Sequence, residues 1–443
     1  MTDSLGSYPN FRLNFEQQRK RAKELLKAAR AGEPAALVRF KSLPRLAEAQ
    51  YLIAQELRFD SWAAFKRHIA AMTREHEAAR AQAALPLNAA SLIDGDMRTL
   101  HVRCGRDLKV PLQDAGFRGD FYEHNYPYLI GPVREGLGCL EERAQFLVDS
   151  YADSRDPPLQ YEPVLRSLER DEQRLHDSAN YDRVVIWSEF DCYDQLVLVR
   201  LLGHYATHRR PPRLELIDIG EFPGAVRFIG LGQLPPEALR LLWTTRKLAT
   251  PAILKLGLGV WRALVDPNPR ALAAIMRSGT PALPLLAKAL HRHLLELPSS
   301  VNGLSFTEDM ALQLLAEDEI NLGRLHARLT YEFDPLPGQG DLQMRDRVLN
   351  MEGANARVYE RRAGIEPNGE ARPPWTDVLT ITDLGRAVLK GDVDFLSLRP
   401  PNRWVGGVRI GPGMPDWRWN EQMKDAMCLD GPESQRHQSK PRA

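Results

Sequence analysis

Three carboxylates follow an apolar run in the middle of the chain. Residues 184–187 read Val-Val-Ile-Trp, and Glu189, Asp191 and Asp194 come directly after them. Open α/β sheets bind their ligands just beyond the carboxyl ends of their strands. Three acidic groups within six residues repel one another unless a proton, a cation or an arginine intervenes, and this suits acid–base catalysis or a divalent ion. We therefore expect a site here, with Gln195 as a further ligand contact.

A purely structural role explains the same residues equally well. Asp191 can cap a helix that begins near Tyr193, and Asp194 suits the first turn of that helix. Gln195 can simply face solvent. The spacing alone leaves both interpretations open.

A second candidate lies after an earlier predicted strand, where the sequence reads Gly105-Arg106-Asp107. A glycine there lets backbone N–H groups approach an anion, and the Arg106 guanidinium can bind phosphate or carboxylate through two hydrogen bonds. No phosphate-loop motif accompanies it, so a tight turn is the favoured alternative. We still expect Arg106 to converge with Glu189 and Asp191 on one pocket, with Asp107 at its rim.

Glu123 and His124 follow the next predicted strand and form a third candidate. An adjacent carboxylate and imidazole can transfer protons. A solvated histidine is the favoured alternative, and we expect Glu123 at the rim of the same pocket.

A fourth candidate is His291-Arg292-His293 with Glu296. His293 and Glu296 are one helical turn apart, as on carboxylate-and-histidine metal helices, but no second such pair accompanies them. A surface-facing helix end is favoured over a metal site. The sequence identifies neither a metal ligand set nor a cofactor.

Size and charge limit the class of protein. A chain of 443 residues is too long for a single hydrophobic core, so several domains are expected. A net charge of +1 argues against general attraction to nucleic acid or membrane. Residues 1–80 are nevertheless basic, with 15 Lys and Arg against 9 Asp and Glu. The four cysteines form no C-x-x-C pair, and neither a signal-peptide pattern nor an apolar run of membrane-spanning length is present. We expect a cytoplasmic protein with reduced thiols.

Strand and helix signals alternate between residues 98 and 235. This alternation predicts an α/β fold with a mostly parallel sheet and helices on both faces. Val184–Trp187 is expected as its central buried strand. The predicted domains are a helical leader (1–75), a linker (76–97), the α/β domain (98–235), a helical segment (236–300), a winged-helix-like α+β domain (301–428) and a disordered tail (429–443).

The first of these segments resembles the helical leader that precedes ankyrin repeats in many bacterial proteins. The resemblance rests on AKELLKAARAGEPAAL (22–37) and AEAQYLIAQELRFDSWAAFKRHI (47–69). No ankyrin repeat follows. The resemblance implies a packing or docking module, whose removal we expect to leave the remainder folded.

From residue 98 to about residue 330 the chain resembles a large bacterial family known only as a domain of unknown function. The resemblance rests on a series of ordered motifs: Gly105-Arg106-Asp107, Gly131-Pro132, Trp187 to Leu196 (WSEFDCYDQL), Gly230 to Leu234 (GLGQL), Trp261, Ala282-Leu283-Pro284, Arg292-His293-Leu294 and Asn302 to Glu308 (NGLSFTE).

This chain departs from the family pattern inside the expected pocket. Arg106 and Asp107 stand where the family has Asp and Ser, Phe190 replaces a histidine, and Tyr126 replaces an acidic residue. The family offers no established reaction to inherit. The changes imply a different ligand, or a catalytic ancestor that became a binding or structural protein.

Two functions are therefore carried forward, and the sequence does not decide whether the protein is an enzyme. The first is binding of a small anionic or polar ligand at the strand ends, with hydrolysis or group transfer as the reaction classes that an acidic site suits. The second is a non-catalytic regulatory or interaction protein. It would use the winged-helix-like domain and the basic leader to contact a protein, or less favourably nucleic acid, because residues 305–350 mix acidic and basic side chains.

Overall fold

The structure is a computed structural model that describes residues 13–135, 138–151, 158–225, 228–334, 336, 340–364 and 374–429. Within these ranges the chain forms two compact units. Unit 1 comprises the described parts of Met1–His124, Ser178–Glu189 and Pro211–Ala249, and unit 2 those of Asn125–Asp177, Phe190–Arg210 and Thr250–Ala443. No helix in these ranges has the length and apolar character needed to span a membrane.

A five-stranded sheet organises unit 1, in the order β2-β1-β3-β4-β5. Its strands are β1 (Thr99–Arg103), β2 (Asp120–Glu123), β3 (Arg183–Glu189), β4 (Arg213–Ile219) and β5 (Lys247–Leu248). The pairs among β1 to β4 are parallel, and only β5 pairs antiparallel. Every residue of β3 is buried, as expected for a central strand of a parallel sheet. The predicted mostly parallel sheet and its central strand are confirmed, whereas helices on both of its faces stay a prediction.

Aromatic side chains pack against one region of this sheet. Helix α5 is Lys109–Asp114 and α9 is Pro236–Trp243. Phe117 and Trp243 both contact His101 of β1, with ring centroids 5.2 and 5.7 Å apart. Trp187 of β3 donates a 3.2 Å hydrogen bond to His101 and meets the Phe117 ring edge-on. These contacts fix α9 on the sheet.

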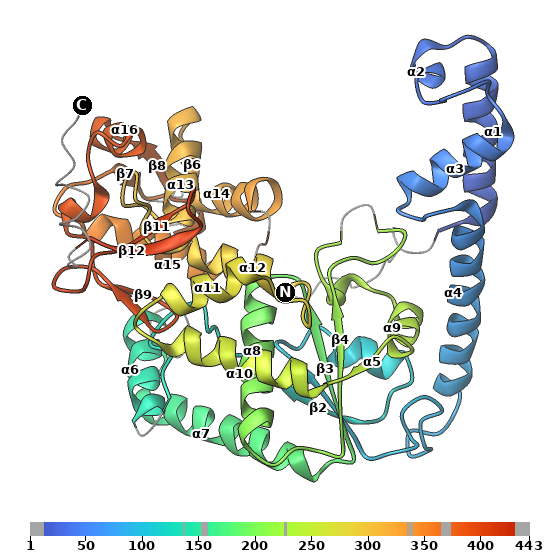
Figure 1. The fold of residues 1–443 in the computed structure, drawn as a ribbon, viewed down its shortest axis with the longest axis horizontal. Helices are drawn as coiled ribbons and strands as arrows, with labels where there is room; N and C mark the ends of the chain where they lie inside the picture. Colours follow the sequence, from blue (N-terminus) through green and yellow to red (C-terminus); the bar gives the residue numbers. More distant parts are fainter. Residues whose placement is uncertain are drawn as a thin grey trace. The chain divides into compact units, whose positions relative to one another are not determined.

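The leader consists of α1 (Phe15–Arg30), α2 (Pro34–Leu37), α3 (Leu46–Glu56) and α4 (Trp62–Ala83) (Figure 1). Ser61 caps α4. An aromatic cluster forms around Phe59, Phe65 and Trp62, with Leu25 and Leu26 against it. The start of the predicted linker at residue 76 lies inside α4.

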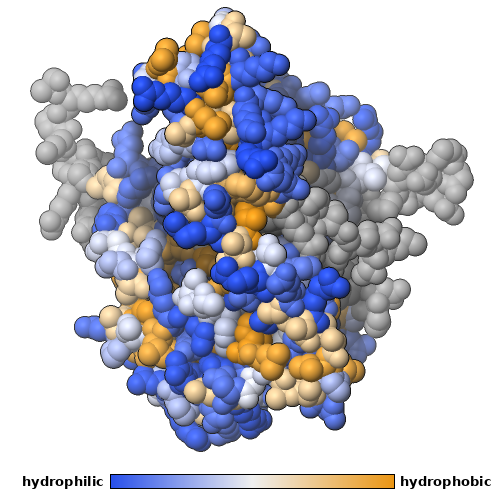
Figure 2. All heavy atoms as spheres, turned by 90° about the vertical axis from the view of Figure 1, so that its right-hand side faces the viewer, coloured by the Kyte–Doolittle hydropathy of each residue, from blue (hydrophilic) through white to orange (hydrophobic). Residues whose placement is uncertain are grey.

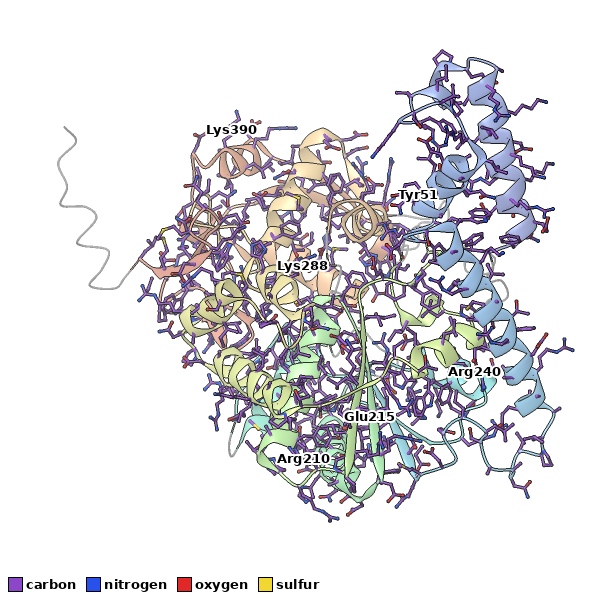
Figure 3. All side chains as sticks on the ribbon, turned by 45° about the vertical axis from the view of Figure 1, so that its right-hand side comes forward. Tyr51, Arg210, Glu215, Arg240, Lys288 and Lys390 are labelled. Atoms are coloured by element: carbon purple, nitrogen blue, oxygen red, sulfur yellow. The ribbon has the colours of Figure 1, made fainter. Side chains whose placement is uncertain are left out.

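The leader also packs on the rest of unit 1. Arg240 of α9, labelled in Figure 3, donates to Glu75 of α4 at 2.8 Å. The Gly224 N–H donates to the Leu57 carbonyl at 3.1 Å, and the His68 ring contacts Phe222. Removal of the leader would therefore also remove these contacts from the rest of unit 1. Folding of the remainder without the leader stays a prediction.

On the face drawn in Figure 2, hydrophilic side chains predominate and hydrophobic ones form small, dispersed patches.

The first half of unit 2 is helical. It contains α6 (Cys139–Tyr151), α7 (Tyr161–Asp177), α8 (Cys192–Thr207), α10 (Pro251–Val265), α11 (Arg270–Ser278) and α12 (Leu286–Leu294). Helices α8 and α10 approach closely because Gly257 faces Leu202. A Cβ atom on Gly257 would lie 2.4 Å from the Leu202 Cβ. Packing of this kind requires glycine.

The second half of unit 2 combines helices with small antiparallel sheets. Its elements are α13 (Phe306–Glu317), β6 (Ile320–Asn321), α14 (Leu322–Arg328), α15 (Asp341–Asn350), β7 (Tyr359–Arg362), β8 (Val378–Ile381), α16 (Asp383–Lys390), β9 (Arg403–Val405), β10 (Val408–Ile410), β11 (Trp417–Asn420) and β12 (Asp425–Cys428). Strands β6, β8 and β7 form one sheet in that order, while β9 pairs with β10 and β11 with β12. A capping box of Ser305 and Glu308 starts α13.

The predicted domain boundaries at residues 75, 97, 235, 300 and 428 stay predictions. Each of the two units combines separate stretches of the chain, whereas the predicted domains are continuous ranges. The units therefore do not test these boundaries. Residues 430–443 of the predicted tail lie outside the described residues.

Candidate functional site

Arg103, the last residue of β1, is the buried centre of an ionic network in unit 1. Its side chain is only 3% exposed and lies 3.0 Å from Glu189 at the end of β3. It also donates to both oxygens of Asp107, at 3.1 and 3.0 Å. A guanidinium that faces two carboxylates offsets their mutual repulsion. The network stands at the carboxyl ends of two adjacent parallel strands, where α/β sheets bind ligands.

A glycine-containing loop closes against this network. The Leu231 N–H donates to the Glu189 carboxylate. A Cβ atom on Gly230 would lie 2.9 Å from a Glu189 oxygen, and one on Gly232 would lie 3.0 Å from an Asp107 oxygen. A side chain at either position would therefore crowd these carboxylates.

Arg106 has a different partner from the one expected. It donates to Glu123 at 2.5 Å, and its own side chain is 81% exposed. The cation that faces Glu189 is Arg103. Convergence of Arg106 with the acidic group stays a prediction, while its pairing with Glu123 places these two predicted site residues together. A Cβ atom placed on Gly105, which precedes Arg106 in the chain, would lie 3.6 Å from an Asp107 carboxylate oxygen.

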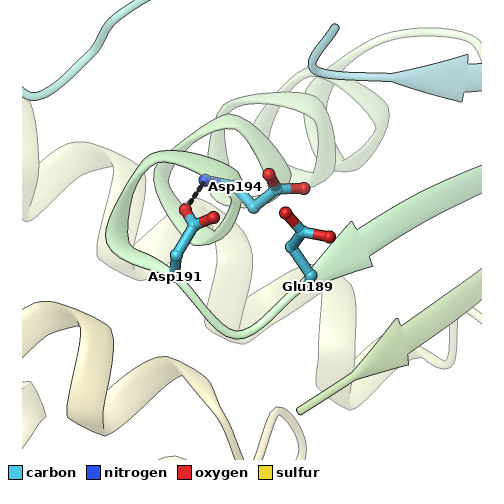
Figure 4. A group of neighbouring side chains, drawn as sticks. All are labelled: Glu189, Asp191 and Asp194. Atoms are coloured by element: carbon cyan, nitrogen blue, oxygen red, sulfur yellow. Dashed lines mark hydrogen bonds between the residues drawn. The ribbon is translucent and has the colours of Figure 1, made fainter. Parts of the chain in front are cut away.

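The acidic segment ends β3 and begins α8. The Asp191 carboxylate accepts the Asp194 N–H at 2.8 Å and caps the helix (Figure 4). The structural role considered for Asp191 is therefore confirmed. Gln195, in the first turn, is fully buried, which contradicts the solvent-facing alternative.

The capping hydrogen bond of Asp191 leaves room for a further role of the three carboxylates. One oxygen each from Glu189, Asp191 and Asp194 lies within 4.8 Å of the others along this continuous segment. Glu189 and Asp194 are buried, and Asp191 is partly buried. Carboxylates at this spacing, removed from water, are suited to hold a divalent cation or to share a proton.

The alternative favoured for His124 is wrong. His124 is completely buried and its Nδ1 lies 2.9 Å from the Tyr122 hydroxyl. A buried imidazole nitrogen needs a hydrogen-bonding partner, and the Tyr122 hydroxyl supplies it.

The surface-facing helix end expected around residue 293 is also wrong. Arg292, His293 and Glu296 are buried in unit 2. Arg292 donates to Glu296 at 2.7 Å and to Asp334 at 3.0 Å, so the charges are paired internally. Burial alone would raise the pKa of Glu296, but Arg292 and Arg347 lower it to about 2. Burial lowers the pKa of His293 to about 4, which leaves it neutral.

Arg103 belongs to the second candidate segment, His101 to Asp107, but sequence reasoning gave it no role in the site, and it did not place the Gly230–Gly232 loop there. An arginine that ends a buried strand is a usable signal, because such a position lies at the strand-end region. The loop belongs to a motif that the family resemblance contained. Its contact with Glu189 joins residues 42 positions apart in the chain.

No family model matches the chain, and no curated protein matches it either. The fold and site above therefore rest on the geometry alone. The four cysteines, all within the described residues, form no disulfide, and Cys192 is buried.

Proposed function

We propose that this protein binds a small anionic or polar ligand at the carboxyl edge of its parallel sheet, with Glu189, Asp191 and Asp194 as the acidic side of the site. The observation that carries the proposal is the Arg103–Glu189–Asp107 network at the ends of β1 and β3, in which Arg103 and Glu189 are buried. Buried ion pairs contribute little net stability compared with apolar packing. Charges that are kept buried at a ligand-binding edge favour a functional role.

The surrounding residues have separable roles in this proposal. Arg106 is exposed enough to leave Glu123 and meet an incoming anion, while the backbone of Gly105 permits close approach. Asp107 holds Arg103 in place. The acidic group either binds a divalent cation that bridges to the ligand or serves as a general base for hydrolysis or group transfer.

Thermal unfolding with a ligand panel tests the proposal. The panel contains small phosphates and carboxylates, each with and without Mg²⁺. A ligand at 100 times its Kd stabilises the protein by about 2.7 kcal/mol, which is readily measured as a shift in melting temperature. We expect at least one panel member to stabilise the wild-type protein and to lose this effect in Glu189→Gln.

Glu77→Gln is the matched control, because Glu77 is an exposed glutamate on α4 of the same unit. It should retain the full ligand shift. A panel without any stabilising member, or an equal shift in both variants, would contradict the proposal. Dependence of the shift on Mg²⁺ separates the cation-binding role from the general-base role.

A second function, protein contact through the end of the chain, is favoured by one observation. The order α13, β6, α14, α15, β7, β8 with the sheet order β6-β8-β7 matches a winged-helix topology. We propose a winged-helix-like domain there and membership in the uncharacterised bacterial family. On the free cysteines we propose a cytoplasmic location.

A further inference from the structure

A cavity of about 630 Å³ lies within unit 2, lined by residues of α6, α7, α8 and α10 and of the segment 126–135. Helices α6 and α7 pack together, as do α8 and α10 (Figure 1). The volume falls in the range of small-molecule sites. None of its lining residues belongs to unit 1.

Aromatic rings form one wall of the cavity. Tyr126 and Tyr128 are stacked, with centroids 5.7 Å apart and planes 13° apart. Trp261 of α10 meets Tyr128 edge-on at 5.3 Å. All three residues are buried, so their rings are held in place and offer a fixed surface to a planar group.

Arg200 sits behind this wall with its charge already offset. It donates to Glu172 at 2.6 Å, and its guanidinium lies 5.2 Å from the Trp261 ring centroid. The pair fixes Trp261 and contributes little net charge to the cavity.

His204 adds a neutral polar group. The residue is 5% exposed, and its Nε2 is buried without a hydrogen-bond partner among the described residues. Burial, with the positive charge of Arg200 adding to it, lowers the pKa of His204 to about 3. Its ring therefore stays uncharged at neutral pH. Buried polar nitrogens are nearly always paired in folded proteins, so this one points to a missing partner.

Arg262 supplies an exposed positive charge at the cavity. It follows Trp261 directly, lines the cavity and is exposed. No ion pair or hydrogen bond joins its side chain to another residue in the described parts of the chain. A guanidinium beside an aromatic wall is suited to an anionic substituent on a planar ring.

We propose that this cavity binds a planar aromatic anion. The ring packs against Trp261 and Tyr128, the carboxylate or phosphate meets Arg262, and an uncharged polar atom of the ring reaches His204. A metal ion does not explain the unpaired nitrogen of His204. Among the described residues, only Glu189, Asp191 and Asp194 come close enough together to share a metal ion.

Calorimetric titration of the full chain tests this site with two probes, adenosine 5′-monophosphate and 1-naphthoate. They distinguish an aromatic phosphate from an aromatic carboxylate. Adenosine lacks the anion and ribose 5-phosphate lacks the aromatic ring, so both serve as controls. We expect at least one aromatic anion to bind at least tenfold more tightly than either control.

Arg262→Gln should weaken that binding about tenfold, which corresponds to the loss of one charge-assisted contact. Lys255→Gln is the matched control, since Lys255 is an exposed cation on α10 that does not line the cavity. It should leave the affinity unchanged. Thr207→Trp fills the cavity from α8 and should abolish binding.

Three results would overturn the inference: binding of neither aromatic anion, equal affinity in the Arg262 and Lys255 variants, or full affinity in a folded Thr207→Trp protein. If Thr207→Trp fails to fold, the Arg262 and Lys255 pair decides alone. Glu189→Gln should bind these probes normally, which separates this site from the proposed strand-end site.

Discussion

At the scale of single residues, Arg103 balances the negative charge of the strand-end carboxylates. Its guanidinium contacts both Asp107 and Glu189. Without it, Asp107 and Glu189 would lose the cation that they share, while the Leu231 N–H would still donate to Glu189. The residue therefore serves the site through charge balance, whatever the ligand.

Arg103→Met should lower the free energy of unfolding by about 3–5 kcal/mol, because it leaves the buried Glu189 carboxylate without this cation. Urea denaturation followed by tryptophan fluorescence measures this change. Arg106→Met is the matched control and should change stability by less than about 0.5 kcal/mol, since that side chain is exposed. Equal effects of the two substitutions would show that the network around Arg103 does not matter to the fold.

The residue scale is also where sequence reasoning was least complete. Asp191 could be predicted as a helix cap because capping depends on residues three positions apart. The partners of Glu189 could not, because Arg103 and Leu231 reach it from distant parts of the chain. For the same reason, burial of His124 and His293 escaped prediction, since burial depends on elements that pack from elsewhere.

At the scale of elements, the α8–α10 pair organises unit 2 and supports the aromatic wall of the cavity. Gly257 lets the two helices approach, whereas Gly259 on the same helix has open space where a Cβ atom would be. These two glycines therefore respond differently to the same substitution.

Gly257→Ala should destabilise unit 2 by about 1–3 kcal/mol, because the added methyl group would overlap Leu202. Gly259→Ala should instead stabilise it by about 0.8–1 kcal/mol, through higher helix propensity with no new contact. Thermal unfolding of the two variants checks both signs. Destabilisation by Gly259→Ala, or tolerance of Gly257→Ala, would contradict the described packing.

Elements with a strong local pattern could be predicted well from the sequence. The burial of β3 follows from its continuous apolar run, and the start of α13 follows from the Ser305–Glu308 capping box. The packing of the leader on α9 could not be predicted, because Arg240 and Glu75 are 165 positions apart and neither shows a distinctive local pattern.

At the scale of the whole molecule, two compact units each contain a place where a small molecule could bind. Unit 1 ends its parallel strands at the Arg103–Glu189–Asp107 network, and unit 2 holds a cavity with an aromatic wall and the exposed cation Arg262. The alternation of strand and helix signals predicted the first of these places. Nothing in that alternation indicated the second, because its lining comes from helices and a connecting segment.

The central claim is that the acidic segment after β3 handles a ligand rather than only capping α8. Asp191→Asn separates these roles, because asparagine caps a helix as well as aspartate does but carries no charge. Two quantities are measured for the variant and for the wild-type protein: the affinity for the best ligand of the panel and the free energy of unfolding. We predict that ligand binding is lost while stability changes by less than about 1 kcal/mol. Unchanged affinity at unchanged stability would contradict the claim and leave Asp191 as a helix cap.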